Sequence, residues 1–311
     1  MPFSSAAEAF DELLRRIELN QTRVALASQR YSAVKAVIEA ALPGKSVRQI
    51  GSFQRKTKIR PADLSDQLDI DVVVSFGPFY QYAAPQAVGT TPSTALDIVR
   101  RALGTHQVYR VMPQRLDHPV VRLEYADQMS IELVPAYEDH TGQHPRLPEQ
   151  PACYIIGSSG GFWRAADYDY DAQTITSLNT LSRNKLVPTI KLVKAYFRNA
   201  GVPLKSFHVE VLVANTVPAT IKAWEEKNYS YGYQFLLANF LTQVSKTIIV
   251  PASLWGSYSP PLNSDLGQST LASLGTFLAA RAEVAWKLCN EKVVGSALSG
   301  WRDFFGDGFP S

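Results

Sequence analysis

The chain has little that would mark a secreted, disulfide-bonded or membrane protein. Only two cysteines occur among its 311 residues, Cys153 and Cys289, and they lie in unlike contexts. This argues against a disulfide framework and a cysteine-rich zinc site, and a reducing cytoplasm is the expected location. The N-terminal MPFSSAAEAFDELLRRIEL carries acidic residues where a signal peptide needs an apolar segment. No apolar run is long enough to span a bilayer, so we expect no membrane partner.

Strong charge and metal-binding histidines are also missing. Charged residues make up 19% of the chain, and the net charge of +3 is too small to indicate nucleic-acid binding by itself. The five histidines lack the spacing of metal ligands, and no Ser-His-Asp or Cys-His arrangement stands out. Hydrophobic residues account for 46%, which is ordinary for a soluble globular protein long enough to form two lobes.

Two aspartates separated by one residue, Asp69 and Asp71, stand at the start of an apolar run in LDIDVVVSF. The β-branched valines at 72–74 predict a buried strand. Residues i and i+2 of a strand project from the same face, so we expect the carboxylates side by side with Ile70 turned into the core. Two ionised carboxylates repel each other unless a cation lies between them. Oxygen ligands of this kind suit Mg²⁺ that is also bound by substrate phosphates.

A Gly-Ser pair and a basic segment precede the aspartates. Gly51 lets the backbone approach a phosphate closely, and Ser52 can donate its hydroxyl and N–H to phosphate oxygens. If a helix starts near Ser52, its N-terminal dipole adds to that attraction. The basic segment RKTKIR at 55–60 is placed to neutralise triphosphate charge, although a solvated loop face explains it equally well.

A third carboxylate, Glu132, lies in the strand-like SIELV. Ile131 and Leu133 flank it, so its side chain projects opposite to theirs and can meet the aspartates on a neighbouring strand. Three carboxylates can hold two divalent ions, one at an attacking hydroxyl and one at a leaving pyrophosphate. We expect Asp69 and Asp71 to bridge both ions and Glu132 to bind the first. The expected cofactor is therefore a pair of Mg²⁺ ions, with Mn²⁺ as an alternative.

Periodicity and turn residues predict a mixed α/β half followed by a helical half. A long helix, or two in series, is expected over 4–42, and a turn-rich region over 138–171. Strands are expected over 46–50, 69–76, 120–125 and 129–137. Further helices are expected over 91–103, 174–183, 186–200, 206–216, 232–246 and 268–292, with breaks at 217–218 and 260–261. This pattern favours an α+β fold of two lobes, residues 1–172 and 173–311, with a cleft between them.

The order of these features resembles the DNA polymerase β-like nucleotidyltransferases, in which a Gly-Ser turn precedes a [DE]x[DE] strand and a third carboxylate lies on a later strand. The closer resemblance is to the cGAS/DncV-like nucleotidyltransferases (CD-NTases) of bacterial cyclic-oligonucleotide signalling. The segments that carry it are GSFQRKT (51–57), DIDVVV (69–74), IELVPAY (131–137), VPTIKLVKAYF (187–197), SFHVEVL (206–212) and WRDFFGDGFP (301–310). Together they extend from about residue 50 to residue 310.

The resemblance implies a bilobed nucleotidyltransferase fold and synthesis of a cyclic di- or trinucleotide from ATP and other NTPs, with Mg²⁺ and release of pyrophosphate. The product would activate a separate effector in an anti-phage (CBASS) system. Some relatives are constitutive, whereas others need a partner protein or a bound ligand. Nucleic acid is not expected as the main substrate.

The resemblance also implies nucleotide contacts in the second half of the chain. Lys194 matches a helical lysine that contacts the triphosphate, and Ser206 matches the serine that follows this helix. The lid of the family is not clear in this sequence. Its best candidate is WGSYSPPLNSD (255–265), in which Tyr258 is expected to stack on a base and Asn263 to read a base edge. The third acid also departs from the family, because Asp is more common than Glu at position 132.

Two other interpretations remain open. A template-independent nucleotidyltransferase could make linear products, acting on RNA or as an oligoadenylate synthase, although the small net charge argues mildly against a long RNA substrate. A catalytically silent nucleotide-sensing module on the same fold is the second. The presence of all three carboxylates counts against that module.

Overall fold

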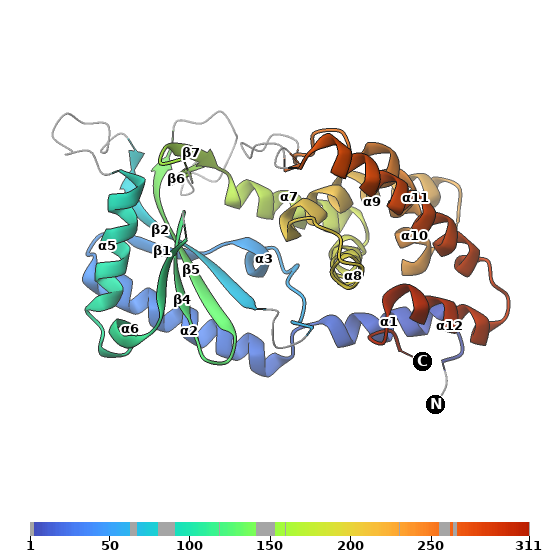
Figure 1. Cartoon of the computed structure of the whole chain (residues 1–311), viewed down its shortest axis with the longest axis horizontal. Coiled ribbons are helices and arrows are strands. Elements are labelled where there is room, and N and C mark those ends of the chain that lie inside the picture. The colour runs from blue at the N-terminus through green and yellow to red at the C-terminus, as the bar shows by residue number, and fades with distance from the viewer. Residues whose placement is uncertain are drawn as a thin grey trace.

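The computed structural model describes residues 3–62, 67–79, 91–117, 119–140, 153–158, 160–229, 231–254, 262–263 and 266–310. The molecule has two lobes, as the sequence predicts. A mixed sheet with helices along it forms one end of the elongated molecule, and a bundle of helices forms the other (Figure 1). Among the described residues, no helix is long and apolar enough to cross a membrane.

The described part of the first lobe contains one seven-stranded sheet. Its strands are β1 (Ser46–Gln49), β2 (Leu68–Pro78), β3 (Gln114–Asp117), β4 (Val120–Glu124), β5 (Met129–Asp139), β6 (Cys153–Gly157) and β7 (Trp163–Ala166). The order is β1-β2-β5-β4-β3, and β6 pairs with both β5 and β7. Among the described strands, only β2 and β5 pair in parallel, and the other pairs are antiparallel.

The four strands that the sequence predicts are confirmed, but the expected turn-rich region is wrong in part. Residues 153–157 and 163–166 form β6 and β7 instead of turns. Both are short, and β6 is stabilised by pairing with the end of β5, from Ala136 to Asp139. Because pairing with a distant strand outweighs local propensity in short segments, the local sequence underestimates this sheet.

The two faces of the sheet have different roles. Ile70, Val72 and Val74 of β2 pack in an apolar cluster with helices α2 (Gln21–Ala41) and α5 (Pro92–Gly104). The alternate residues Asp69, Asp71 and Val73 must therefore project from the opposite face. On that face, Val73 packs in a smaller cluster with Val134, Ile156 and Ala166. The short helices α3 (Gly51–Gln54) and α6 (Gln107–Val111) complete the first lobe.

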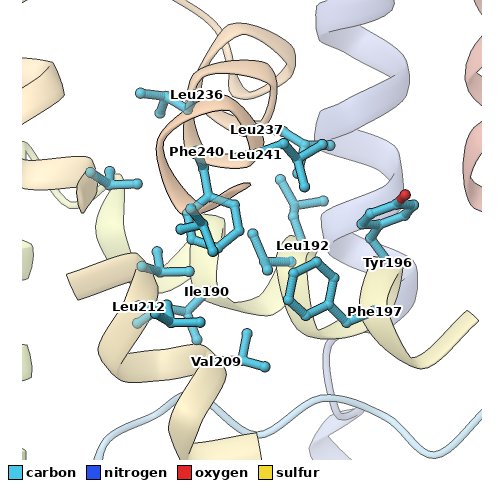
Figure 2. Close-up of a cluster of buried hydrophobic side chains, with 14 of the residues drawn as sticks. Ile190, Leu192, Tyr196, Phe197, Val209, Leu212, Leu236, Leu237, Phe240 and Leu241 are labelled. Carbon is cyan, nitrogen blue, oxygen red and sulfur yellow. The ribbon is translucent and has the colours of Figure 1, made fainter. Parts of the chain in front are cut away.

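The second lobe is helical. Its helices are α7 (Tyr168–Leu181), α8 (Leu186–Asn199), α9 (Ser206–Glu226), α10 (Tyr233–Thr247), α11 (Gln268–Cys289) and α12 (Val294–Phe305). Figure 2 shows side chains of α8, α9 and α10 meeting in its core, including Leu192, Val209 and Phe240. The predicted break at 217–218 is wrong, because α9 continues through Pro218. The predicted break at 260–261 lies outside the described residues.

The N-terminal segment forms two helices in series. Helix α1 (Ala6–Ile17) ends before Asn20, whose side chain caps α2 by accepting a hydrogen bond from the N–H of Arg23. Although α1 is first in the chain, it packs in the core of the helical lobe beside α12 (Figure 1). Phe10 meets Trp301 edge-to-face, with 4.9 Å between ring centroids. The division of the chain at residue 172 stays a prediction.

Candidate active site

The three predicted carboxylates lie on one face of the sheet, near the starts of the adjacent strands β2 and β5. In the parallel pairing of β2 with β5, Asp69 is opposite Ser130 and Asp71 is opposite Glu132. Ile131 and Leu133 pack in the same apolar cluster as Ile70, so Glu132 projects from the same face as the aspartates. The register therefore places all three carboxylates together, and all three line one cleft of about 540 Å³. That volume lies in the usual range for small-molecule sites.

Gly51 and Ser52 lie directly against these carboxylates. Helix α3 begins at Gly51, whose φ of 72° is a left-handed conformation that favours glycine. A Cβ atom at Gly51 would collide with the Asp71 carboxylate. The N–H of Ile50 donates to the Asp71 carbonyl at 2.9 Å, which fixes the turn to β2. The Gly-Ser turn and strand β2 thus form one unit, and glycine is required for their close approach.

Basic side chains surround the carboxylates in the cleft. Arg55, Lys58, Arg164 and Lys205 line it together with Ser206 at the first turn of α9. Burial raises the pKa of the Asp71 carboxyl, while Lys58 and Arg55 oppose that shift and Asp69 adds to it. Of the predicted basic segment, Lys56 and Arg60 are exposed. A negatively charged ligand is favoured between these cations and the sheet.

Arg122 on β4 is a site residue that the sequence analysis missed. It is opposite Glu132 in the antiparallel pairing of β4 with β5. Its guanidinium donates to Glu132 Oε1 at 2.8 Å and to Asp69 Oδ1 at 2.9 Å, and it also contacts Gln67. Aligning the two predicted strands across their short turn would have placed Arg122 beside Glu132. The two outer carboxylates of the triad are thus bridged by one cation of the protein itself.

The donor set suits a divalent metal, but the side chains are not gathered for one. Among the described residues, no three His, Cys, Asp or Glu side chains converge closely enough to hold a metal ion. The carboxylates of Asp69 and Glu132 turn toward Arg122 instead. Three carboxylates on one face of two paired strands are the hard oxygen ligands that Mg²⁺ requires. The three carboxylates therefore fit the ion by their chemistry and position. To bind it, Asp69 and Glu132 would have to exchange their contacts with Arg122 for the metal.

Lys194 and Ser206 lie beside the cleft from the helical lobe. Both line a neighbouring cavity of about 370 Å³, which also contains Lys58 and Asp69. Lys194 is only 6% exposed, and its ammonium contacts Glu210 Oε1 at 2.7 Å and the Thr57 carbonyl at 3.1 Å. The predicted contact of Lys194 with a triphosphate stays a prediction, and the structure shows that this charge is already paired inside the protein.

The two predicted lid residues have different outcomes. Tyr258 lies outside the described residues. Asn263 is 5% exposed, and its amide bonds the backbone: Oδ1 accepts from the N–H of Ala252, and Nδ2 donates to the carbonyls of Ile248 and Val250. Its side chain therefore organises the chain after α10. Reading of a base edge by Asn263 stays untested, and it would require these bonds to break.

Comparisons with known proteins agree with this geometry. Residues 4–151 match the family model of the Second Messenger Oligonucleotide or Dinucleotide Synthetase domain, SMODS. The chain is 25% identical over 296 residues to a probable cyclic nucleotide synthase of Bacillus cereus (strain VD146), with 86% of this chain and 83% of that protein covered.

Two groups of solved structures have the same fold. One is CdnC of Escherichia coli MS115-1 with ATP, at a TM-score of 0.69 and 15% identity, with 98% of this chain and 99% of that chain covered. The same CdnC is also known in complex with HORMA-deltaN. The other is Vibrio cholerae DncV cyclic AMP-GMP synthase with the linear intermediate 5′ pppA(3′,5′)pG, at a TM-score of 0.73 and 11% identity, with 99% and 97% covered.

The sheet, the helical lobe and the overall arrangement are those of the CdnC and DncV structures. The SMODS match covers the first lobe, and the similarity to the probable cyclic nucleotide synthase extends over most of the chain. The chain is thus similar to the cGAS/DncV-like nucleotidyltransferases, which make cyclic oligonucleotides, both in its first lobe and in its overall fold. The resemblance described from the sequence is confirmed.

Proposed function

We propose that this enzyme joins NTPs, ATP among them, into a cyclic di- or trinucleotide with release of pyrophosphate. The observation that supports this most is the register of β2 and β5, which places Asp69, Asp71 and Glu132 on one face beside Gly51 and Ser52. Relatives with this fold are known with ATP and with a linear dinucleotide intermediate. The cleft is large enough for a nucleotide, and basic side chains line its walls.

In the proposed reaction, a ribose hydroxyl of one nucleotide attacks the α-phosphorus of a bound NTP. The P–O bond to pyrophosphate breaks as the new ester forms, and a second step of the same kind closes the ring. The N–H groups of the Gly-Ser turn and the Ser52 hydroxyl would bind phosphate oxygens. The N-terminus of α9, which begins at Ser206, lies on the other side of the cleft and favours negative charge there. Lys58 and Lys205 would neutralise further phosphate charge.

Asp69, Asp71 and Glu132 would hold two Mg²⁺ ions in this scheme. When bound, such ions activate the attacking hydroxyl and stabilise the leaving pyrophosphate. The carboxylates would orient the ions, and the bound ions would relieve the repulsion among the three carboxylates. Glu in place of Asp at position 132 adds one methylene to the ligand and keeps its oxygen donors.

We further propose that the product is a second messenger for a separate effector in anti-phage defence, made in the cytoplasm where NTPs are abundant. This proposal rests on the similarity to that family. A regulatory protein is also proposed, because the related CdnC forms a complex with HORMA-deltaN. The two lobes would have different roles in this scheme. Residues 1–172 would supply the metal ligands, and residues 173–311 would supply NTP-binding groups.

The test compares the wild type with an Asp69→Asn/Asp71→Asn variant, each incubated with mixed NTPs and Mg²⁺. We expect the wild type to release pyrophosphate and the variant to lose activity by about 10³-fold or more, since residues that act as a unit carry most of the rate. Thermal melting should show that the variant stays folded. Equal product from both proteins would reject the proposal.

The form of the product separates the remaining interpretations. A cyclic product resists phosphatase, because it has no terminal phosphate, and mass spectrometry of the mixture identifies its bases. A phosphatase-sensitive ladder would instead indicate a linear oligonucleotide synthase. Binding of ATP without pyrophosphate release, with and without candidate partner proteins, would indicate a nucleotide-sensing module.

A further inference from the structure

A buried carboxylate, that of Asp169, is bound to the chain on both sides of the Gly-Ser turn. Asp169 lies in the first turn of α7 and is 3% exposed. Its Oδ1 accepts from Gln54 Nε2 at 2.8 Å and from Arg48 Nη2 at 3.3 Å, and its Oδ2 lies 3.1 Å from Arg48 Nη1. Arg48 belongs to β1, which precedes the turn, and Gln54 ends α3, which begins at Gly51.

The sheet holds this carboxylate in its orientation through Tyr154 on β6. The Tyr154 hydroxyl accepts from Arg48 Nη1 at 2.8 Å and donates to Asp169 Oδ2 at 3.4 Å. Burial raises the pKa of Tyr154, and the charge of Asp169 adds to that shift, so the phenol keeps the proton that it donates. Arg48, Tyr154 and Asp169 therefore form a triangle in which each side chain contacts the other two.

Helix α7 connects this triangle to the helical lobe. Figure 1 shows α7 running from the sheet toward α8 and α9. Through Asp169, its first turn is bonded to β1, α3 and β6. Further along α7, Ile175 is fully buried in the core of the helical lobe, where the helix packs against α8 and α9. Asp169 thus connects the Gly-Ser turn to the lobe that carries Ser206.

Asp169 does not line the active-site cleft. It lines a separate cavity of about 380 Å³ together with Arg48 and Gln54, whereas Gly51 and Ser52 line the cleft. The bonds of Asp169 to the two residues that flank the turn therefore reach the cleft from behind. The carboxylate can act on a bound nucleotide through the position of the turn, without touching the nucleotide.

The amide of Gln54 is poorly suited to a purely stabilising role. Its Nε2 donates to Asp169, but its Oε1 is buried and has no hydrogen-bond partner among the residues that the structure describes. A buried acceptor without a partner costs free energy, and an apolar side chain of similar length would avoid that cost. A polar group that remains at such a position calls for another explanation, and a role in the adjacent site supplies one.

We propose that Asp169 is a positioning residue of nucleotidyl transfer, which acts through Arg48 and Gln54 to hold the Gly-Ser turn against the phosphates of a bound NTP. This inference rests on the proposed function. The N–H groups of the turn and the Ser52 hydroxyl bind phosphate oxygens at their full strength when β1 and α3 are both fixed. A displacement of about 1 Å at a reacting centre can cost about 10²-fold in rate.

The decisive variant is Gln54→Met, which removes the bond between α3 and Asp169 and leaves Asp169 paired with Arg48. Its matched control is Thr176→Val in the same cavity, where the hydroxyl donates to the Ala172 carbonyl of its own helix at 2.8 Å. For each protein, kcat/KM, the melting temperature and the Kd values of α,β-methylene-ATP and adenosine are measured. The ratio of the two Kd values reports phosphate binding and does not depend on turnover.

For Gln54→Met we expect the preference for the ATP analogue over adenosine and the value of kcat/KM each to fall by about tenfold, the scale of one hydrogen bond to a charged group. The melting temperature should not fall, because the lost bond and the lost unpaired acceptor offset each other. For Thr176→Val we expect no change. An unchanged preference in Gln54→Met would overturn the proposal, and so would an equal fall in Thr176→Val.

Asp169→Asn tests the carboxylate itself. It keeps the shape of the side chain and removes the charge that pairs with Arg48, so both sides of the turn loosen and we expect kcat/KM to fall by about 10²-fold. A folded Asp169→Asn variant with wild-type kcat/KM would contradict the proposal. If that variant does not fold, Gln54→Met decides.

Binding of Mn²⁺ in the absence of nucleotide separates the turn from the carboxylates of β2 and β5. Those carboxylates are placed by strand pairing, so the Kd of Mn²⁺ for Asp169→Asn should stay within about threefold of the wild type. Mn²⁺ binding weakened as much as binding of the ATP analogue would show a general disturbance of the site and overturn the proposal. Failure of the wild type to prefer the analogue over adenosine would count against the proposed function itself, so the two failures are distinguishable.

Discussion

Two arginine–carboxylate clusters stand close together in this enzyme, and they differ in their access to water. Arg122 bridges Asp69 and Glu132 on the face of the sheet, where the three side chains are 17%, 33% and 22% exposed. Arg55 pairs with Glu210 between the lobes, where the side chains are 7% and 0% exposed. Both arginines neutralise carboxylates of the same cleft, yet only the first cluster is partly open to water.

Exposure to water decides which of these ion pairs can exchange partners. A partly exposed pair contributes little net stability, because water and ions replace its partners readily. A fully buried pair cannot lose one member without leaving an uncompensated charge in a medium of low polarity. We therefore interpret Arg122 as a replaceable counter-ion for Asp69 and Glu132, and Arg55 as a permanent one for Glu210.

The largest expected effect comes from deleting the buried carboxylate. Glu210→Ala leaves Arg55 and Lys194 buried without their anion, so we expect the free energy of unfolding to fall by about 3–5 kcal/mol. Asp69→Ala should change it by less than about 1 kcal/mol, since that carboxylate is partly exposed and repelled by Asp71. Urea denaturation measures both values.

An exposed pair serves as the control for this comparison. Asp127 contacts Arg30 at 2.7 Å with 45% of its side chain exposed, and Asp127→Ala should cost less than about 1 kcal/mol. If Glu210→Ala lowers the free energy of unfolding no more than Asp127→Ala, the buried cluster does not stabilise the lobe interface, and its ion pairs are no more permanent than an exposed one.

A smaller effect is expected from acid. The pKa of Glu210 lies at about 2 in the folded protein, below its ordinary value of 4.5, because two cations favour the charged form. A depressed carboxyl pKa contributes stability that is present above pH 4.5 and lost as the pH falls toward 2. Between these values the melting temperature of the wild type should fall more steeply with pH than that of Glu210→Gln. If the melting temperatures of the wild type and Glu210→Gln fell equally steeply with pH, the pKa of Glu210 would be the same in the folded and unfolded protein.

The carboxylate triad could be predicted from the sequence because its determinants are local. Alternation within β2 places Asp69 and Asp71 together, and the apolar neighbours of Glu132 place it on the matching face. The Gly-Ser turn was likewise predictable, although only the structure shows that Gly51 is required by the Asp71 side chain. The position of Arg122 beside Glu132 could also have been predicted, since it depends only on the register of the hairpin formed by β4 and β5.

The residues between the lobes could not be predicted in the same way. Glu210 and Arg55 are 155 positions apart, and nothing in the local pattern of either segment identifies the other. Lys194 resembled a phosphate ligand from its place in a motif, but its hydrogen-bond partners come from Thr57 and Glu210. Packing of α1 against the C-terminal aromatic residues is equally non-local. Contacts of this kind depend on how the lobes close, which local periodicity does not encode.

The smallest expected effect sharpens the interpretation of Arg122. Its two partly exposed pairs with Asp69 and Glu132, at about 0.7 kcal/mol each, correspond to about tenfold in affinity for a competing cation. Arg122→Gln should therefore bind Mn²⁺ about tenfold more tightly in the absence of nucleotide, as measured by the loss of the free-ion EPR signal. The control is Arg115→Gln on neighbouring β3, where the side chain is 72% exposed and pairs with Glu124, and no change is expected there. Unchanged or weaker Mn²⁺ binding by Arg122→Gln would mean that the arginine does not compete with the metal, and that its contacts with Asp69 and Glu132 hold the ligands in place instead.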